Sequence, residues 1–306
     1  MMKTNKIYHG DSLAVLSGMP DGFAQCCVTS PPYWGLRDYG VDGQAGLEST
    51  PEAYIENMVD IFAQVRRVLK DDGTLWVNIG DSYVAPKTGS PGNKSTITGG
   101  QRNQNEAGKR PDKKHAGALK PKDMIGIPWM LAFALRADGW YLRQDIIWHK
   151  TNGLPESVKD RCTSSHEHIF LLSKRPKYYF DADAIAEPAK WERWGNQTEN
   201  KIHQGKAGYL AGADLPVRDT KNKRDVWSIP TKGFVGAHFA TYPPDLIRPC
   251  IMAGSKQGDI ILDPFMGSGT TAIVAQQEQR KWVGIELNES YIRLAEKRIQ
   301  ETCGMF

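Results

Sequence analysis

Two short stretches of the sequence place chemically capable side chains at sharp turns, and the first is built on two adjacent prolines. Residues 29–35 read Thr-Ser-Pro-Pro-Tyr-Trp-Gly and end an apolar run that starts at residue 23. Proline locks φ, so a proline pair makes a rigid corner. The corner fixes the direction of the Ser30 hydroxyl on one side and of the Tyr33 ring on the other. These groups suit hydrogen bonding and stacking to a substrate.

The second stretch is a glycine-rich turn between an expected strand and an expected helix, at residues 259–271. Gly267 and Gly269 allow the backbone to turn tightly and to approach a ligand without a Cβ in the way. Asp263 ends the expected strand, and ligands in α/β sheets bind outside the carboxyl ends of strands. Its carboxylate is therefore predicted to accept hydrogen bonds from a ligand, and Thr270 is predicted to cap the helix.

The next expected strand, residues 281–287, ends with an acid, and together with the glycine-rich turn this acid is typical of a nucleotide-binding site. Glu286 follows the glycine turn by about 20 residues, where an acid is placed to hold two ribose hydroxyls. Capping of the helix that follows is the alternative role for this carboxylate. The turn has no third glycine for a dinucleotide fingerprint and no Gly-Lys-Ser/Thr for a phosphate-binding loop.

These turns require a sheet that presents strand ends side by side. Apolar spacing predicts a helix after Pro51 that ends at residues 71–73, then a strand at 74–80. Strands alternate with helices to the end of the chain, which predicts an α/β protein with a doubly wound, mostly parallel sheet. The remaining predicted strands are 23–30, 141–150, 166–174, 259–265 and 281–287, and the remaining helices are 127–139, 244–254, 270–279 and 289–302.

Composition limits the class of protein. The 306 residues are 40% hydrophobic, which suits a sizeable core, and contain no run of the roughly 18 apolar residues that span a membrane. The first residues lack the apolar core of a signal peptide, so we expect a cytoplasmic protein with no membrane partner. Five cysteines without CxxC spacing predict reduced thiols and no metal site.

Two polar segments interrupt the alternation. Residues 83–122 carry nine Lys or Arg but two acids, a larger local excess than the net charge of +4 for the whole chain. Such an excess is typical of polyanion binding, although a solvated loop is an open alternative. Residues 186–225 are also polar and contain aromatic residues beside Lys and Arg.

Taken together, these motifs resemble those of the S-adenosylmethionine-dependent amino-group DNA methyltransferases, which methylate N4 of cytosine or N6 of adenine. The resemblance is carried by residues 29–35, 263–271 and 283–287, and it covers most of the chain outside the two polar segments. The corner precedes the cofactor turn, which resembles the β order of motifs in this family. The resemblance implies a circularly permuted, Rossmann-like methyltransferase fold with inserted DNA-recognition segments.

The resemblance also gives the proline corner a role. The lone pair of an exocyclic amine is delocalised into the base, so acceptors must hold its N–H groups and direct the lone pair toward the methyl group. Ser30 Oγ and the Pro31 carbonyl are the candidate acceptors, and Pro32 fixes their direction. The base must leave the duplex to be reached, and Tyr33 offers it a ring face.

S-adenosyl-L-methionine is the cofactor that the resemblance implies. Asp11 matches the acid that reaches the adenine amino group, and the segment around Thr241 matches the one that closes over the methionine end, with Tyr-Pro-Pro where many relatives have Gln-Lys-Pro. His166 and Glu167 match a strand beside the base pocket, as site groups or as a structural pair. The predicted cofactor residues are Asp11, Thr241, Asp263, Pro264, Phe265, Gly267, Gly269, Thr270, Glu286 and Leu287.

The expected organisation divides the chain at the two polar segments. The catalytic half comprises residues 1–82 and 123–185, the cofactor-binding half comprises residues 226–306, residues 83–122 form a basic insertion, and residues 186–225 form a target-recognition segment. Double-stranded DNA is the expected partner, and a homodimer and a cognate restriction endonuclease are left open. The residues predicted to contact DNA are Lys109, Arg110, Lys113, Lys114, Trp191 and Trp194.

Several functions share parts of this pattern. Cytosine C5 methylation needs a nucleophilic cysteine, and Pro249-Cys250 lies before the cofactor turn, whereas that family has it after the turn. RNA or protein methyltransferases share the cofactor half. A catalytically inactive DNA-binding protein need not keep Ser30, Asp11 and Glu286 together. A serine at the start of the corner favours cytosine N4 over adenine N6 as the target.

Overall fold

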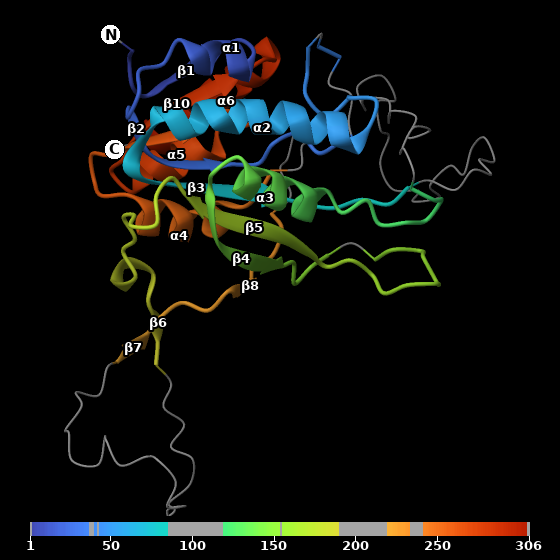
Figure 1. The fold of residues 1–306 in the computed structure, drawn as a ribbon. Coiled ribbons are helices and arrows are strands. Elements are labelled where there is room, and N and C mark those ends of the chain that lie inside the picture. The colour runs from blue at the N-terminus through green and yellow to red at the C-terminus, as the bar shows by residue number, and fades with distance from the viewer. Residues whose placement is uncertain are drawn as a thin grey trace, which may run out of the picture.

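A computed structural model gives the structure of residues 2–36, 40–41, 43–84, 119–153, 155–189, 219–232 and 241–304. Its centre is an eight-stranded sheet with the strand order β1-β10-β9-β2-β3-β5-β4-β8 (Figure 1). The strands are β1 Lys6–His9, β2 Ala24–Thr29, β3 Leu69–Ile79, β4 Tyr141–His149, β5 His166–Ser173, β8 Val226–Ser228, β9 Ile260–Asp263 and β10 Lys281–Glu286.

Most neighbouring strands are parallel, as the sequence predicts. Strands β1, β10, β9, β2 and β3 run parallel, whereas β5 is antiparallel to both β3 and β4. At the centre, β2 from the start of the chain pairs with β9 from near its end, with Cys27 opposite Leu262. This pairing brings the ends of the corner strand and of the cofactor strand to the same edge of the sheet.

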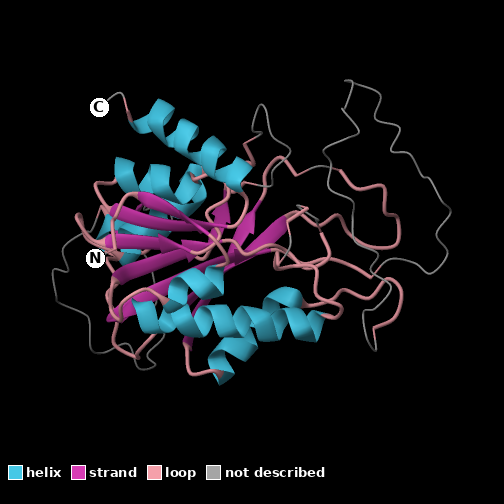
Figure 2. Ribbon diagram, turned by 90° about the horizontal axis from the view of Figure 1, so that it is seen from above, coloured by secondary structure: helices cyan, strands magenta, loops and turns pink. Residues whose placement is uncertain are grey.

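Helices cover both faces of the sheet (Figure 2). Helices α1, α2 and α3 share one core with the strands, and α4, α5 and α6 share the other. The bounds are α1 Ser12–Ser17, α2 Pro51–Val68, α3 Ile127–Ala137, α4 Pro244–Gly254, α5 Thr270–Gln277 and α6 Glu289–Cys303. The doubly wound α/β prediction is therefore confirmed. None of the helices in these described ranges is long and apolar enough to cross a membrane.

The strand that leads into the proline corner is buried along its whole length. In β2, Cys27 belongs to the core that contains α1, α2 and α3, whereas Cys26 and Val28 belong to the core on the opposite side of the sheet. All five cysteines are free thiols, and burial raises the pKa of the Cys26 thiol to about 12. The sequence predicted buried thiols; four of the five are buried and Cys162 is exposed. The buried strand β2 leads directly into the corner.

The boundary between α2 and β3 differs from the prediction. The helix ends at Val68, and β3 begins at Leu69, so the residues that were expected to end the helix already lie in the strand. Gly73 makes this possible because a Cβ there would lie 2.9 Å from the Gln25 carbonyl oxygen. Pairing of the early part of β3 with a bulged β2 overrides the local turn signal.

The ends of both polar segments are described and are held together. Val84 exchanges backbone hydrogen bonds with Lys122 and Asp123, and Tyr83 bridges Met124. The second segment is closed by a small ribbon, in which β6, Glu187–Pro188, pairs with β7, Thr220–Lys221. Residues 85–118 and 190–218 lie outside the described residues, so the domain boundaries proposed for these segments stay predictions.

Replacement of Gly254 by alanine is expected to destabilise the fold. A Cβ at this last residue of α4 would lie 2.7 Å from both Cys26 Sγ and Thr74 Oγ1, so α4 would have to move off the sheet. We expect Gly254→Ala to lower the free energy of unfolding by about 1–3 kcal/mol, measured by urea denaturation. Gly18→Ala is the matched control, because its nearest neighbour would be 3.6 Å away. Equal midpoints for the two variants would contradict this packing.

Candidate active site

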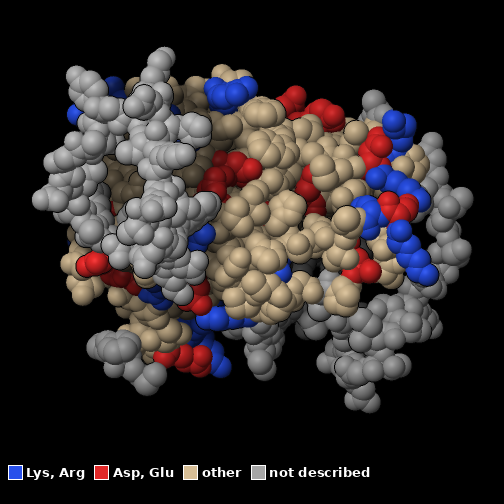
Figure 3. Space-filling model, turned by 90° about the horizontal axis from the view of Figure 1, so that it is seen from below, with Lys and Arg blue, Asp and Glu red and all other residues tan. Residues whose placement is uncertain are grey.

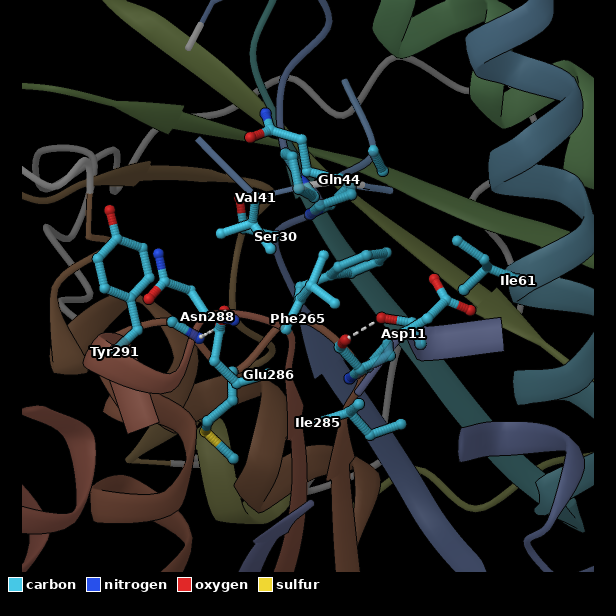
Figure 4. Close-up of a pocket in the computed structure, with 18 of the residues that line it drawn as sticks. Asp11, Ser30, Val41, Gln44, Ile61, Phe265, Ile285, Glu286, Asn288 and Tyr291 are labelled. Atoms are coloured by element: carbon cyan, nitrogen blue, oxygen red, sulfur yellow. Dashed lines mark hydrogen bonds between the residues drawn. The ribbon is translucent and has the colours of Figure 1, made fainter. Parts of the chain in front are cut away.

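A cavity of about 240 Å³ lies where the ends of β2, β9 and β10 meet (Figure 4). The corner residues from Ser30 to Tyr33 line one wall, and the glycine turn and the end of β10 line another. The predicted residues that line the cavity are Asp11, Ser30, Pro31, Pro32, Tyr33, Thr241, Pro264, Phe265, Gly267, Thr270, Glu286 and Leu287. Two predicted cofactor residues, Asp263 and Gly269, are absent from this lining.

The proline corner directly follows β2 and is supported from α2. The Tyr54 hydroxyl, fully buried, donates a hydrogen bond of 2.9 Å to the Pro32 carbonyl. Trp34 Nε1 donates to the Glu48 carbonyl at 2.8 Å, which ties the end of the corner to the loop before α2. Sequence reasoning missed Tyr54 as a supporting residue, although it lies in the apolar stripe of a helix that starts with proline.

Tyr33 is held by a residue from a distant strand. Its hydroxyl donates to Glu167 Oε2 at 2.7 Å. Burial and the nearby Glu167 charge raise the pKa of Tyr33 well above its usual value, so the hydroxyl stays protonated. His166 points elsewhere, since it is exposed and its ring lies against His168. Of the two residues that the sequence singled out on this strand, Glu167 is the one that reaches the corner.

The glycine turn has the predicted backbone conformation. Gly267 and Gly269 have φ angles of 51° and 78°, in the left-handed region that favours glycine. Gly267 lines the cavity, whereas a Cβ at Gly269 would lie 3.1 Å from the Ala295 Cβ, so Gly269 allows close packing with α6.

The prediction that Thr270 caps α5 is wrong. Gly269 is the N-cap and Thr270 is the first helical residue. The Thr270 hydroxyl instead accepts a hydrogen bond from Arg298 Nη1 at 2.8 Å, and the same nitrogen donates to the Ser268 carbonyl. Arg298 thus fastens the glycine turn to α6, a contact that joins residues too far apart in the chain for a local motif to reveal.

Asp263 lies beneath the cavity. Its fully buried carboxylate accepts hydrogen bonds from Thr29 Oγ1 at 2.7 Å, Thr271 Oγ1 at 2.6 Å and the Tyr242 hydroxyl at 3.2 Å. The Phe265 backbone N–H is a fourth donor at 3.0 Å. The structure therefore places Asp263 as a link between β2, β9 and α5, with its oxygens directed to the protein.

Glu286 and Asp11 bring two carboxylates to the cavity. Glu286 Oε2 accepts from the Gly267 N–H at 2.8 Å, and Oε1 accepts from the Asn288 N–H at 2.9 Å. Burial raises the pKa of Glu286 despite these hydrogen bonds. Asp11 is the N-cap of α1 and accepts from the Ala14 N–H at 2.9 Å. Each carboxylate is thereby held in one orientation at the rim of the cavity.

The donor and acceptor pattern of the cavity fits a nucleoside. Glu286 and Asp11 supply acceptors for hydroxyl and amino groups, and Phe265, Ile61 and Ile285 supply an apolar wall for a flat ring (Figure 4). Gly267 lets a ligand approach the backbone closely. Sequence reasoning had assigned no role to residues 41–45, although Val41 and Gln44 also line the cavity.

Comparisons with known proteins agree with this geometry. A family model described as DNA methylase matches residues 24–297. The chain belongs to this family, N6_N4_Mtase. It is 50% identical to the Type II methyltransferase M.Cfr9I of Citrobacter freundii, over 96% of this chain and 87% of that protein. It is also 48% identical to M.SmaI of Serratia marcescens, over 97% and 91% of the two chains.

Solved structures show the same fold at low identity. The PvuII DNA methyltransferase matches with a TM-score of 0.64 and 18% identity, over 99% of this chain and 93% of that chain. TTHA0409 of Thermus thermophilus, solved with S-adenosyl-L-methionine, matches with a TM-score of 0.61 and 22% identity, over 98% and 95%. This chain is a Type II DNA methyltransferase of the amino-group kind, and its cofactor is S-adenosyl-L-methionine.

The cytosine C5 alternative does not fit this site. Cys250 is fully buried within α4 and does not line the cavity. Burial raises the pKa of its thiol well above the usual value, which opposes formation of a nucleophilic thiolate.

The raised pKa of Glu286 predicts a pH dependence of cofactor binding. Ionised Glu286 is an acceptor for hydroxyl groups, and protonation removes part of this capacity. Affinity for S-adenosyl-L-methionine should therefore fall as pH decreases through the raised pKa, starting at a higher pH than for an ordinary glutamate. Isothermal titration calorimetry across pH measures this effect.

Glu286→Gln should weaken binding by about 1–3 kcal/mol above that pKa and flatten the pH dependence. Glu289→Gln is the control, because Glu289 is an exposed acid in the first turn of α6. A pH dependence that persists unchanged in Glu286→Gln would contradict the predicted role of this carboxylate in cofactor binding.

Proposed function

We propose that this enzyme transfers a methyl group from S-adenosyl-L-methionine to the exocyclic N4 of a flipped-out cytosine in double-stranded DNA. The observation that carries the proposal is Ser30, which begins the proline corner and lines the same cavity as Glu286. Serine both donates and accepts hydrogen bonds, whereas an aspartate at this position would only accept. The PvuII enzyme, which has the same fold, is described as cytosine-N4-specific, and this supports the choice.

The corner is proposed to hold the target amine. Ser30 Oγ and the Pro31 carbonyl accept from its two N–H groups and direct the nitrogen lone pair toward the methyl donor. The Pro32 carbonyl is already engaged by Tyr54, and no residue within the described ranges donates to the Pro31 carbonyl. The base is extruded from the duplex and lies on the Tyr33 ring.

The cofactor site is proposed to use the remaining predicted residues. When bound, S-adenosyl-L-methionine supplies an electrophilic methyl group on a sulfonium. Glu286 accepts from the ribose hydroxyls, Asp11 accepts from the adenine amino group, and Thr241 lies at the methionine end. Asp263 and Gly269 are proposed to support the cofactor site indirectly. Asp263 holds the start of the turn by its hydrogen bond with Thr29, and Gly269 lets the turn pack closely against α6.

Contact with DNA is assigned to the two polar segments, and the residues concerned lie outside the described residues. They are Lys109, Arg110, Lys113, Lys114, Trp191 and Trp194. On the face shown in Figure 3, basic and acidic side chains of the described residues lie intermixed. Lys122 pairs with Asp160 and Arg161 pairs with Glu156 at 2.6 Å in both cases, which offsets their charge. A cognate restriction endonuclease and a homodimer stay predictions.

The identity of the methylated nucleoside tests the proposal directly. The protein is incubated with labelled S-adenosyl-L-methionine and mixed-sequence DNA, and the product is digested to nucleosides and separated. We expect the label in N4-methylcytosine. Label in N6-methyladenine would establish the alternative target that this family also serves, and label in neither would overturn amino-group methylation of DNA.

Removal of the Ser30 hydroxyl should affect turnover far more than cofactor binding. An interaction that is made to the reacting amine contributes chiefly in the transition state, so Ser30→Ala should lower kcat by about 100-fold. The dissociation constant for S-adenosyl-L-methionine should change little. Ser17→Ala is the control, because Ser17 is an exposed hydroxyl bonded only to its own helix. Loss of cofactor affinity in parallel with turnover would place Ser30 in the cofactor site instead.

A further inference from the structure

A partly buried polar cluster connects Tyr33 of the corner to strands β3 and β5. Its centre is Glu167 on β5, which accepts from the Tyr33 hydroxyl at 2.7 Å and from Asn78 Nδ2 on β3 at 3.1 Å. Lys150, directly after β4, forms an ion pair with the other carboxylate oxygen. The Lys150 ammonium also lies 4.8 Å from the centre of the Trp148 ring. Residues from β3 and from the segments that follow β2 and β4 therefore hold this one carboxylate.

The cluster is closely fitted to the Tyr33 ring. A Cβ at Gly80, which directly follows β3, would lie 2.9 Å from Tyr33 Cε2 and 3.2 Å from the Glu167 side chain. Only a residue without a side chain leaves room for the ring and the carboxylate to meet at this point. The contact thus depends on two separate features, the hydrogen bond and the absence of a Cβ.

Placing the charged side chains of Glu167 and Lys150 in this partly buried space is energetically unfavourable. Removal of a carboxylate and an ammonium from water carries a desolvation penalty, and replacing the pair by apolar residues of similar volume often leaves stability unchanged. The Glu167 side chain is only 13% exposed and that of Lys150 is 23% exposed. An apolar wall would cover the Tyr33 ring but would not fix its tilt, whereas a hydrogen bond to its hydroxyl does.

We infer that Glu167, held in place by Lys150 and Asn78, is a positioning residue that sets the Tyr33 ring in the orientation that receives the extruded base. The inference deepens the proposed function and depends on its assignment of Tyr33 as the stacking platform. Glu167 accepts a hydrogen bond from the Tyr33 hydroxyl and is not among the residues that line the 240 Å³ cavity, so the inference places its action on Tyr33. Tyr33 remains a protonated donor to this carboxylate, since burial and the Glu167 charge raise its pKa.

Three variants disturb this contact in different ways. Tyr33→Phe keeps the ring and removes the hydroxyl together with its hydrogen bond with Ser30, whereas Glu167→Ala removes the acceptor alone. Gly80→Ala displaces the ring while both partners remain. Small misplacements in a reacting complex cost up to about 100-fold in rate, so each variant should lower kcat by about 10- to 100-fold. The dissociation constant for S-adenosyl-L-methionine should stay within about twofold, because the cofactor wall is untouched.

A spectroscopic signal separates positioning from general structural support. DNA with pyrrolocytosine, a fluorescent cytosine analogue, at the target position reports stacking of the extruded base, because stacking quenches its fluorescence. Each variant should give brighter bound DNA than the wild type. Glu167→Gln, which retains an acceptor for Tyr33, should recover part of both the turnover and the quenching. Lys70→Met is the matched control, since it removes an ion pair of 2.9 Å with Asp259 that lies away from the cavity.

The outcomes distinguish this inference from the proposed function. Wild-type turnover and quenching in Tyr33→Phe and Glu167→Ala would overturn the inference while amino-group methylation stands. An equal loss of turnover, cofactor affinity and thermal midpoint in all three variants would also overturn it, because the cluster would then be structural. A wild-type enzyme that methylates no DNA base would overturn the proposed function instead, whatever the fluorescence of the variants.

Discussion

The hydrogen bond between Thr29 and Asp263 joins the two halves of the site. Thr29 ends β2, Asp263 ends β9, and their side chains meet at 2.7 Å in the buried centre of the sheet. The residues after Thr29 form the proline corner, and those after Asp263 form the glycine turn. Because parallel strands end at the same edge of the sheet, one short contact sets the separation between the group that would hold the amine and the turn that would hold the methyl donor.

Rigidity at the corner comes from a second layer of residues as much as from proline. The prolines fix the backbone angles, but they do not decide where the corner lies relative to the rest of the protein. Tyr54 fixes the Pro32 carbonyl from α2, and Glu167 fixes the Tyr33 hydroxyl from β5. The corner is therefore held from two sides, which suits a reaction whose rate depends on the alignment of a weak nucleophile.

In the glycine turn, too, some residues line the cavity and others hold the turn in place. Gly267 approaches the cavity, whereas Gly269 allows α6 to pack closely and Arg298 of α6 then bonds to the turn. The two glycines have the same left-handed backbone and different roles. Asp263 is an acid that could accept hydrogen bonds from a ligand, but its carboxylate already accepts them from protein groups.

Local patterns in the sequence determined the alternation of strands and helices, the proline corner and the left-handed glycine turn, because φ restrictions and apolar periodicity act over a few residues. From these followed the fold class, the family and the cofactor. Only the tertiary structure decided that Glu167 meets Tyr33 across 134 positions and that Asp263 lies beneath the cavity. Such contacts depend on strand order, register and close packing, and no local spacing encodes which side chains these will bring together.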